Sequence, residues 1–182
     1  MTSRCPLRLT ILLCLAGAAL SVNYGVLRFQ LQSSTSACRE LLRQLIRSPQ
    51  YCLADTRDFQ IPEEVKQPRQ VQKEEAMVVM HEMLQQIFSL FCRNFSSPGW
   101  NETVMENLLE ELHWQMDRLE EAMQQGEFPW ESRTVHRLKT YYLGIIRYLK
   151  AKSYSRCAWT VVQVAILKNF SFLNGLIDAL RD

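Results

Sequence analysis

The sequence predicts an all-α fold, a five-helix up-up-down-down bundle with a long first crossover loop, and three observations support this. Of the 182 residues, 47% are apolar and 22% are charged, so the chain can bury a core. Only six glycines are present, which disfavours turn-rich barrels and sandwiches. Five stretches repeat apolar residues with helical spacing, and no proline interrupts them.

The N-terminal segment, residues 1–21, has the parts of a secretory signal peptide. Two arginines precede the apolar run 9–20, whose twelve residues are fewer than the roughly 20 that span a bilayer. The small residues Ala19 and Ser21 precede the expected cleavage site between Ser21 and Val22. The alternatives are an N-terminal anchor or a buried helix. Cleavage would leave one soluble, exported helical domain, residues 22–182, with a formal charge of zero.

The first predicted helix covers residues 23–47 and is followed by a long connection. Its apolar residues recur every three or four positions, with Ser34 as a polar break: Leu27, Leu31, Cys38, Leu41 and Leu45. Residues 48–72 hold three prolines and no sustained rhythm, so they predict a crossover loop. Such a length favours an up-up-down-down bundle over a simple up-down bundle, because antiparallel neighbours need only short loops.

The second and third predicted helices cover residues 73–94 and 101–125, and each has one inward apolar stripe. The stripe of the second helix consists of Met77, Met80, Leu84, Ile87 and Phe91. The stripe of the third consists of Met105, Leu108, Leu112, Met116, Leu119 and Met123. Residues 125–129, which contain a glycine and a proline, end the third helix.

The fourth and fifth predicted helices cover residues 132–152 and 154–180. The inward residues of the fourth are Val135, Leu138, Tyr142, Ile145 and Leu149. Those of the fifth are Trp159, Val162, Ile166, Phe170, Leu173 and Ile177. Three further apolar residues broaden the stripe of the fifth helix, so we expect it to be the most buried.

A search for catalytic or metal-binding motifs finds none, so the sequence predicts a binding protein rather than an enzyme. His81 and Glu82 begin like a zinc-protease motif, but Gln85 stands where the second histidine is needed. The balance of 21 basic and 19 acidic residues gives no support to nucleic-acid binding. No stretch after residue 21 approaches membrane-spanning length. We therefore expect no cofactor, no metal, no nucleic-acid partner and no membrane insertion.

Four cysteines remain after residue 21, in an export route where disulfides persist. They are Cys38, Cys52, Cys92 and Cys157. Four cysteines allow three full pairings, and their spacing does not choose among them.

Export also makes three N-glycosylation sequons relevant, which begin at Asn94, Asn101 and Asn169. Asn101 follows a loop-like Ser-Ser-Pro-Gly run and is the first candidate, with Asn94 close by. Asn169 lies inside a predicted helix, where the alternative is an unmodified side chain.

The second predicted helix carries a second stripe of residues, which lies beside its apolar stripe. His81, Gln85, Phe88 and Cys92 recur at spacings of four, three and four, with Glu82 beside them. A polar stripe with one aromatic side chain predicts a contact surface with an anchor. The alternative is that Phe88 widens the core.

A string at the fourth and fifth helices resembles the type I interferon family. Residues 141–159 (YYLGIIRYLKAKSYSRCAW) fit the family signature at every defined position. Residues 61–67 (IPEEVKQ), 80–91 (MHEMLQQIFSLF) and 99–112 (GWNETVMENLLEEL) also look like that family, so the resemblance covers essentially the whole chain.

The resemblance implies a five-helix secreted cytokine that acts as a monomer. It would bridge two chains of the type I interferon receptor and trigger JAK/STAT antiviral and antiproliferative signalling. A ligand of this kind acts by proximity, because two faces on one rigid body raise the local concentration of one receptor chain near the other. The competing interpretations are another secreted helical cytokine and a secreted lipid-binding helical protein.

The resemblance also implies site residues. The higher-affinity receptor chain would contact the crossover loop and the fifth helix at Leu53, Arg57, Asp58, Gln163, Val164, Leu167, Lys168 and Ser171. The lower-affinity chain would contact the second helix at His81, Glu82, Gln85 and Phe88. Thr56 and Gln163 stand where the family often has basic residues.

The same resemblance implies a disulfide between Cys52 and Cys157. Cys38 and Cys92 would then stay reduced, and the alternative is a second bridge between them.

Overall fold

The computed structural model describes residues 23–45, 52, 57–67, 71–92, 99–124 and 126–181, and in this part of the chain all regular structure is helical. The expected signal peptide and its cleavage site lie outside the described residues. The helices are α2 (Tyr24–Leu45), α3 (Glu63–Lys66), α4 (Lys73–Cys92), α5 (Glu102–Met123), α6 (Arg133–Ala151) and α7 (Arg156–Asp178). Each end of the five long helices lies within two residues of its predicted position.

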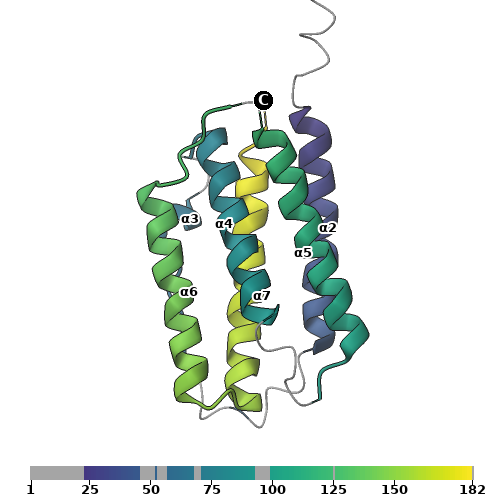
Figure 1. Ribbon diagram of the computed structural model, residues 1–182, viewed down its shortest axis with the longest axis vertical. Coiled ribbons are helices and arrows are strands. Elements are labelled where there is room, and N and C mark those ends of the chain that lie inside the picture. The colour runs from purple at the N-terminus through teal and green to yellow at the C-terminus, as the bar shows by residue number, and fades with distance from the viewer. Residues whose placement is uncertain are drawn as a thin grey trace, which may run out of the picture.

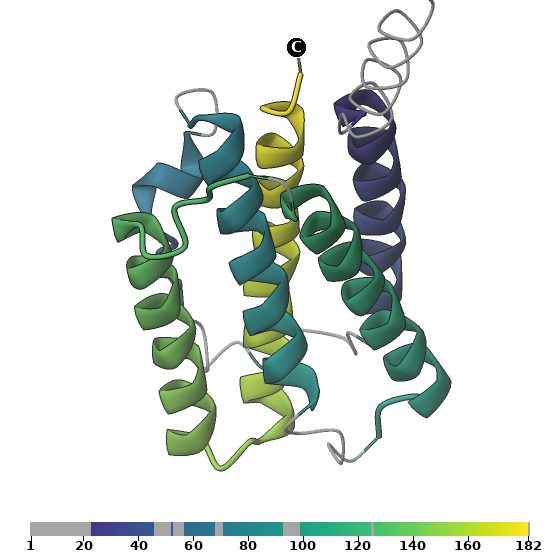
Figure 2. The same ribbon diagram turned by 45° about the horizontal axis from the view of Figure 1, so that its top comes forward.

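The direction of the helices confirms the predicted bundle topology. Figure 1 shows α2, α4 and α6 running one way and α5 and α7 running the other. The parallel pair α2 and α4 is joined by the long crossover, and α5 and α7 are the two helices that return. Helix α6 is the additional fifth helix, which lies at the edge of the bundle (Figures 1 and 2).

The starts of α5, α6 and α7 are set by local hydrogen bonds. Asn101, Ser132 and Ser155 are N-cap residues, and each side-chain oxygen accepts a hydrogen bond from the backbone N–H three residues later. The crossover differs from the prediction because it contains the short helix α3. Val65 of α3 is buried in the core, so tertiary packing orders a segment that has no sequence rhythm.

Helix α4 is the most buried of the long helices, so the prediction for α7 was wrong. Twelve of the 20 residues of α4 are buried, against twelve of the 23 of α7. Helix α4 packs against α5, α6 and α7, and α7 packs against α2, α3, α4 and α6, so both helices are central to the bundle. A smaller difference occurs on α2, where Leu42 rather than Leu41 is fully buried.

By length and composition α7 is apolar enough to cross a membrane, contrary to the expectation that no later stretch would be. Its apolar residues instead line the core, including the fully buried Trp159, Ile166 and Phe170. Burial against the other helices accounts for this hydropathy.

An aromatic cluster closes one end of the core. The ring of Trp159 lies 4.8 Å from that of Trp100 and 5.9 Å from that of Phe91, measured between ring centroids. The cluster joins the last turn of α4, the segment before α5 and the first turn of α7. Aromatic pairs at such separations stabilise beyond the area that they bury.

Candidate interaction surfaces

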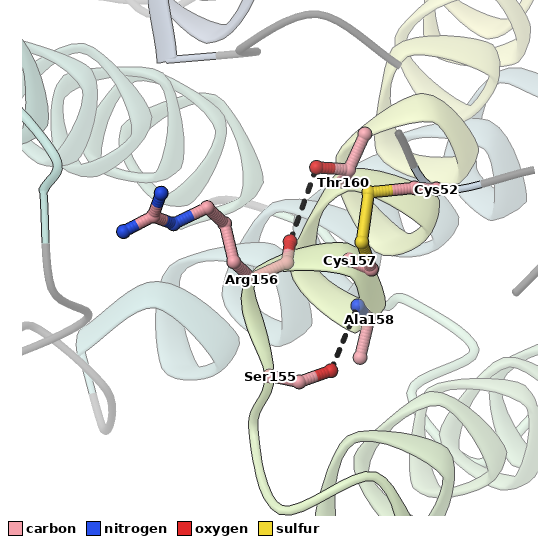
Figure 3. The surroundings of a disulfide bond; sticks show 6 residues. All are labelled: Cys52, Ser155, Arg156, Cys157, Ala158 and Thr160. Atoms are coloured by element: carbon pink, nitrogen blue, oxygen red, sulfur yellow. Dashed lines mark hydrogen bonds between the residues drawn. A yellow bond between two sulfur atoms is a disulfide. The ribbon is translucent and has the colours of Figure 1, made fainter. Parts of the chain in front are cut away.

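A disulfide holds the crossover loop against the first turn of α7 (Figure 3). It joins Cys52 to Cys157, the pair that the resemblance implied, with 5.2 Å between their Cα atoms. Next to it, the Ser155 hydroxyl accepts a hydrogen bond of 3.2 Å from the N–H of Ala158, which caps the helix where the cross-link attaches (Figure 3).

A second set of contacts joins the crossover loop to the bundle. The ammonium group of Lys168 on α7 lies 3.4 Å from a carboxylate oxygen of Asp58. The guanidinium group of Arg57 lies 5.4 Å from the ring centroid of Phe59 and 5.5 Å from that of Tyr148 on α6. Loop residues and α7 residues thus form one continuous surface.

The predicted contact residues on α7 differ in exposure. Lys168 and Ser171 are exposed, Val164 is 41% exposed and Leu167 is half-buried. Leu53 lies outside the described residues.

Gln163 was predicted wrongly as a contact residue, because it is only 1% exposed. It precedes Ile166 by three positions and Phe170 by seven, so helical geometry turns it to the core. Its amide nitrogen is buried and has no hydrogen-bond partner among the described residues. Only the resemblance implies a contact at Gln163. The helical spacing from the inward residues Ile166 and Phe170 already predicts that this side chain faces the core.

The predicted contacts at His81 and Glu82 on α4 were also wrong, since these side chains are 7% and 6% exposed. The His81 Nε2 atom lies 2.7 Å from a carboxylate oxygen of Glu120 on α5, and Trp130 packs edge-on against the imidazole ring, 5.4 Å away. Glu82 lies 3.7 Å from the ammonium group of Lys139 on α6. Both residues therefore join α4 to its neighbours. The sequence analysis did not predict these partners, because the residue pattern of one helix does not show which side chains of other helices pack against it.

Two members of the second stripe do reach the surface of α4. Gln85 and Cys92 are exposed. Phe88 is half-buried, packs on the core cluster and lies 6.2 Å from the His113 ring. Phe88 thus widens the core and also contributes to the outer surface.

The two free thiols differ in accessibility. Cys38 is buried, and burial raises the pKa of its thiol far above the usual range. The Gln115 amide donates a hydrogen bond of 3.3 Å to its sulfur. Cys92 is exposed at the end of α4.

This difference predicts selective alkylation. Iodoacetamide at pH 8 should modify Cys92 but not Cys38 in the folded domain without residues 1–21, because the thiolate is the reactive form and must be accessible. Mass spectrometry should detect one modified thiol before unfolding and two afterwards. Cys92→Ser should remove the modification of the native state; rapid native alkylation of that variant would contradict the buried environment of Cys38.

The sequon asparagines lie in opposite environments. Asn101 is exposed, and its Oδ1 accepts the capping hydrogen bond from Val104, which leaves Nδ2 free for a glycan. Asn169 is 1% exposed, and its Nδ2 donates a hydrogen bond of 3.0 Å to the hydroxyl oxygen of Tyr142. The Tyr141 hydroxyl donates to Asn169 Oδ1 at 3.1 Å, and burial raises the pKa of Tyr141 to about 12. The folded domain therefore has no room for a glycan on Asn169, which corrects that candidate; Asn94 lies outside the described residues.

Glycan mapping tests this difference. In protein secreted from animal cells, Thr103→Ala should remove one glycan, since it destroys the Asn101 sequon and keeps the asparagine cap. Ser171→Ala should leave the intact mass unchanged apart from the substitution, because we expect the buried Asn169 to carry no glycan. A glycopeptide that contains Asn169 would show that this helix is modified before it folds.

Comparison with known proteins places the chain in a family. Residues 27–180 match the interferon alpha/beta domain. The chain is 55% identical to interferon beta of Equus caballus and 52% identical to that of Felis catus, with all of both chains covered in each comparison. It is 46% identical to interferon beta of Homo sapiens, again over the full length of both.

Solved structures support the fold independently of sequence. Zebrafish interferon 1 superposes with a TM-score of 0.69 at 17% identity, and the match covers 82% of this chain and 96% of the zebrafish chain. The family match, the full-length relatives and the five-helix bundle agree. This chain belongs to the interferon alpha/beta family, the type I interferons, which are helical cytokines rather than enzymes.

Proposed function

We propose that this chain, a secreted type I interferon cytokine, binds both chains of the type I interferon receptor as a monomer after removal of residues 1–21. Two faces of one rigid bundle would hold the receptor chains together. The signal inside the cell then follows from proximity, through JAK/STAT activation and its antiviral and antiproliferative programme.

The first proposed face, for the higher-affinity receptor chain, combines the crossover loop with α7. Its residues are Leu53, Arg57, Asp58, Val164, Leu167, Lys168 and Ser171. The observation that carries this proposal is the cross-linked surface, in which the Cys52–Cys157 bond and the Asp58–Lys168 ion pair keep loop and helix together. A preordered surface loses less conformational entropy when it binds.

The second proposed face, for the lower-affinity receptor chain, lies on α4 around Gln85 and Phe88. Gln85 is exposed, and Phe88 offers part of its ring beside His113. His81 and Glu82 support this face from within by their bonds to α5 and α6. They are positioning residues in this proposal.

STAT phosphorylation in cells that carry the matched receptor tests the proposal. Val164→Asp should weaken potency by about tenfold or more, because a charge replaces an exposed apolar side chain at the centre of the first face. Val26→Asp, on α2, is the matched control, since Val26 is 51% exposed and lies outside both faces. Equal potency of the two variants would exclude the α7 face, and a folded wild type without activity would overturn the assignment of function.

Binding to each purified receptor ectodomain separates the two faces. Val164→Asp should weaken binding to one ectodomain only, and Gln85→Arg should weaken binding to the other only. Both variants should lose potency in cells, because bridging needs both contacts. A single ectodomain that responds to both substitutions would contradict the two-face arrangement.

A further inference from the structure

A groove between α2 and α5 belongs to neither proposed receptor face. Its volume is about 360 Å³, and these two helices supply its lining: Phe29, Gln30, Ser33, Ser34, Ala37, Glu110, Glu111 and Trp114. Phe29 is 72% exposed, more than any other large hydrophobic side chain in the described part of the chain. Exposed aromatic side chains that line a hollow are typical of interaction sites.

None of the residues that line this groove is among those of the two proposed faces. On α2, Gln32 turns toward α7, where its amide donates a hydrogen bond of 3.1 Å to Asp178, while Ser34 turns toward α5 and bonds Glu111. On α5, Glu120 turns toward α4, where it meets His81. By helical geometry, Phe29 lies near Gln32 and so borders the α7 side of α2, whereas Ser33 and Ala37 lie farther round that helix. On α5, Glu111 and Trp114 lie on the side away from α4.

The lining indicates the chemistry of an occupant. Glu110 and Glu111 supply two carboxylates, and no basic residue lines the groove. Ser34 donates a hydrogen bond to the Glu111 carboxylate and so holds it at the wall. The Trp114 ring already has the guanidinium group of Arg118 5.8 Å from its centroid, a cation–π contact of the kind that a second arginine could make with an exposed part of the ring.

We propose that this groove is a third interaction surface, which docks a protein segment that presents an arginine next to an aliphatic side chain. The guanidinium group would pair with Glu110 and Glu111, in the fork geometry that arginine makes with carboxylates. The aliphatic side chain would pack between Phe29 and Trp114. Charge complementarity and apolar contact then act in the same groove.

Two synthetic peptides serve as probes, one that alternates leucine with arginine and one with glutamate in place of each arginine. NMR titration of the isotope-labelled protein should show saturable shifts of the Trp114 indole N–H and the Phe29 and Ala37 amides with the arginine peptide alone. Glu110→Lys and Phe29→Ser should each weaken binding by about tenfold or more. Glu131→Lys, the same charge change at an exposed site outside the groove, should leave binding unchanged.

Three results would overturn the proposal. They are shifts that map outside the groove, equal binding of the glutamate peptide, and unchanged affinity in Glu110→Lys. Because Phe29 and Glu110 are exposed, both variants should keep the thermal stability of the wild type, which separates lost binding from lost folding. Both should also keep full potency in the STAT assay, and a loss of potency there would show that the groove belongs to a receptor face.

Discussion

Replacement of both cysteines of the Cys52–Cys157 disulfide by serine should lower the free energy of unfolding by about 4 to 5 kcal/mol. The bond spans 105 residues of sequence, so it removes much of the conformational freedom of the unfolded chain. In the chain-entropy model a loop of this length gives a stabilisation near the top of the usual range. Denaturant unfolding monitored by circular dichroism measures the difference.

The same substitution should also reduce potency, because the crossover loop loses its covalent attachment to α7. Cys92→Ser is the matched control, since Cys92 is an exposed free thiol and its loss should change stability by less than about 0.5 kcal/mol. If the double serine variant unfolds at the same denaturant concentration as Cys92→Ser, the disulfide does not stabilise the folded state.

Trp159→Ala should destabilise the protein by about 3 to 5 kcal/mol. The side chain is 1% exposed and packs against Phe91 and Trp100, so its removal leaves a cavity and breaks two aromatic contacts. Phe91 lies in the last turn of α4 and Trp100 lies just before α5. The loss of the Trp159 side chain should therefore weaken the packing of α4, α5 and α7 at this end of the bundle. Thermal and denaturant unfolding provide the measurement.

Phe29→Ala is the control for the tryptophan variant. Both substitutions remove an aromatic side chain from a helix, but Phe29 is 72% exposed and should contribute within about 0.5 kcal/mol of zero. Similar losses in the two variants would mean that the aromatic cluster is not a principal part of the core. Trp159 follows Cys157 by two residues, so the tryptophan and disulfide effects are expected to couple rather than add.

The helices themselves could be predicted because their cause is local. Apolar residues such as Leu84 and Ile87 recur at helical spacing, and proline is confined to the connections, so periodicity alone predicts where each helix lies. The inward residues predicted for α4, α5, α6 and α7 are all buried, including Met105 and Tyr142. The caps at Asn101 and Ser132 were not predicted, although asparagine and serine are residue types that favour this position.

The interaction surfaces could be predicted only in part, because exposure depends on what packs across a helix. His81 looks polar in sequence, yet Glu120 and Trp130 from distant segments cover it. Asn169 satisfies the sequon pattern, yet two tyrosines of α6 hold its amide in the interior. A polar side chain can be buried when tertiary partners satisfy its hydrogen bonds, and such partners leave no periodic signal.

Sequence alone determined the family, the fold class, the ranges of the five long helices and nearly all residues of the core stripes, because all of these depend on residue order and local periodicity. Tertiary structure alone decided that Gln163 faces the core, that Lys168 of α7 pairs with Asp58 of the loop and that a groove opens beside Phe29. The physical reason is the range of the interactions. Helix formation is set within a few residues, whereas burial and surface shape arise from contacts between segments as far apart as Cys52 and Cys157.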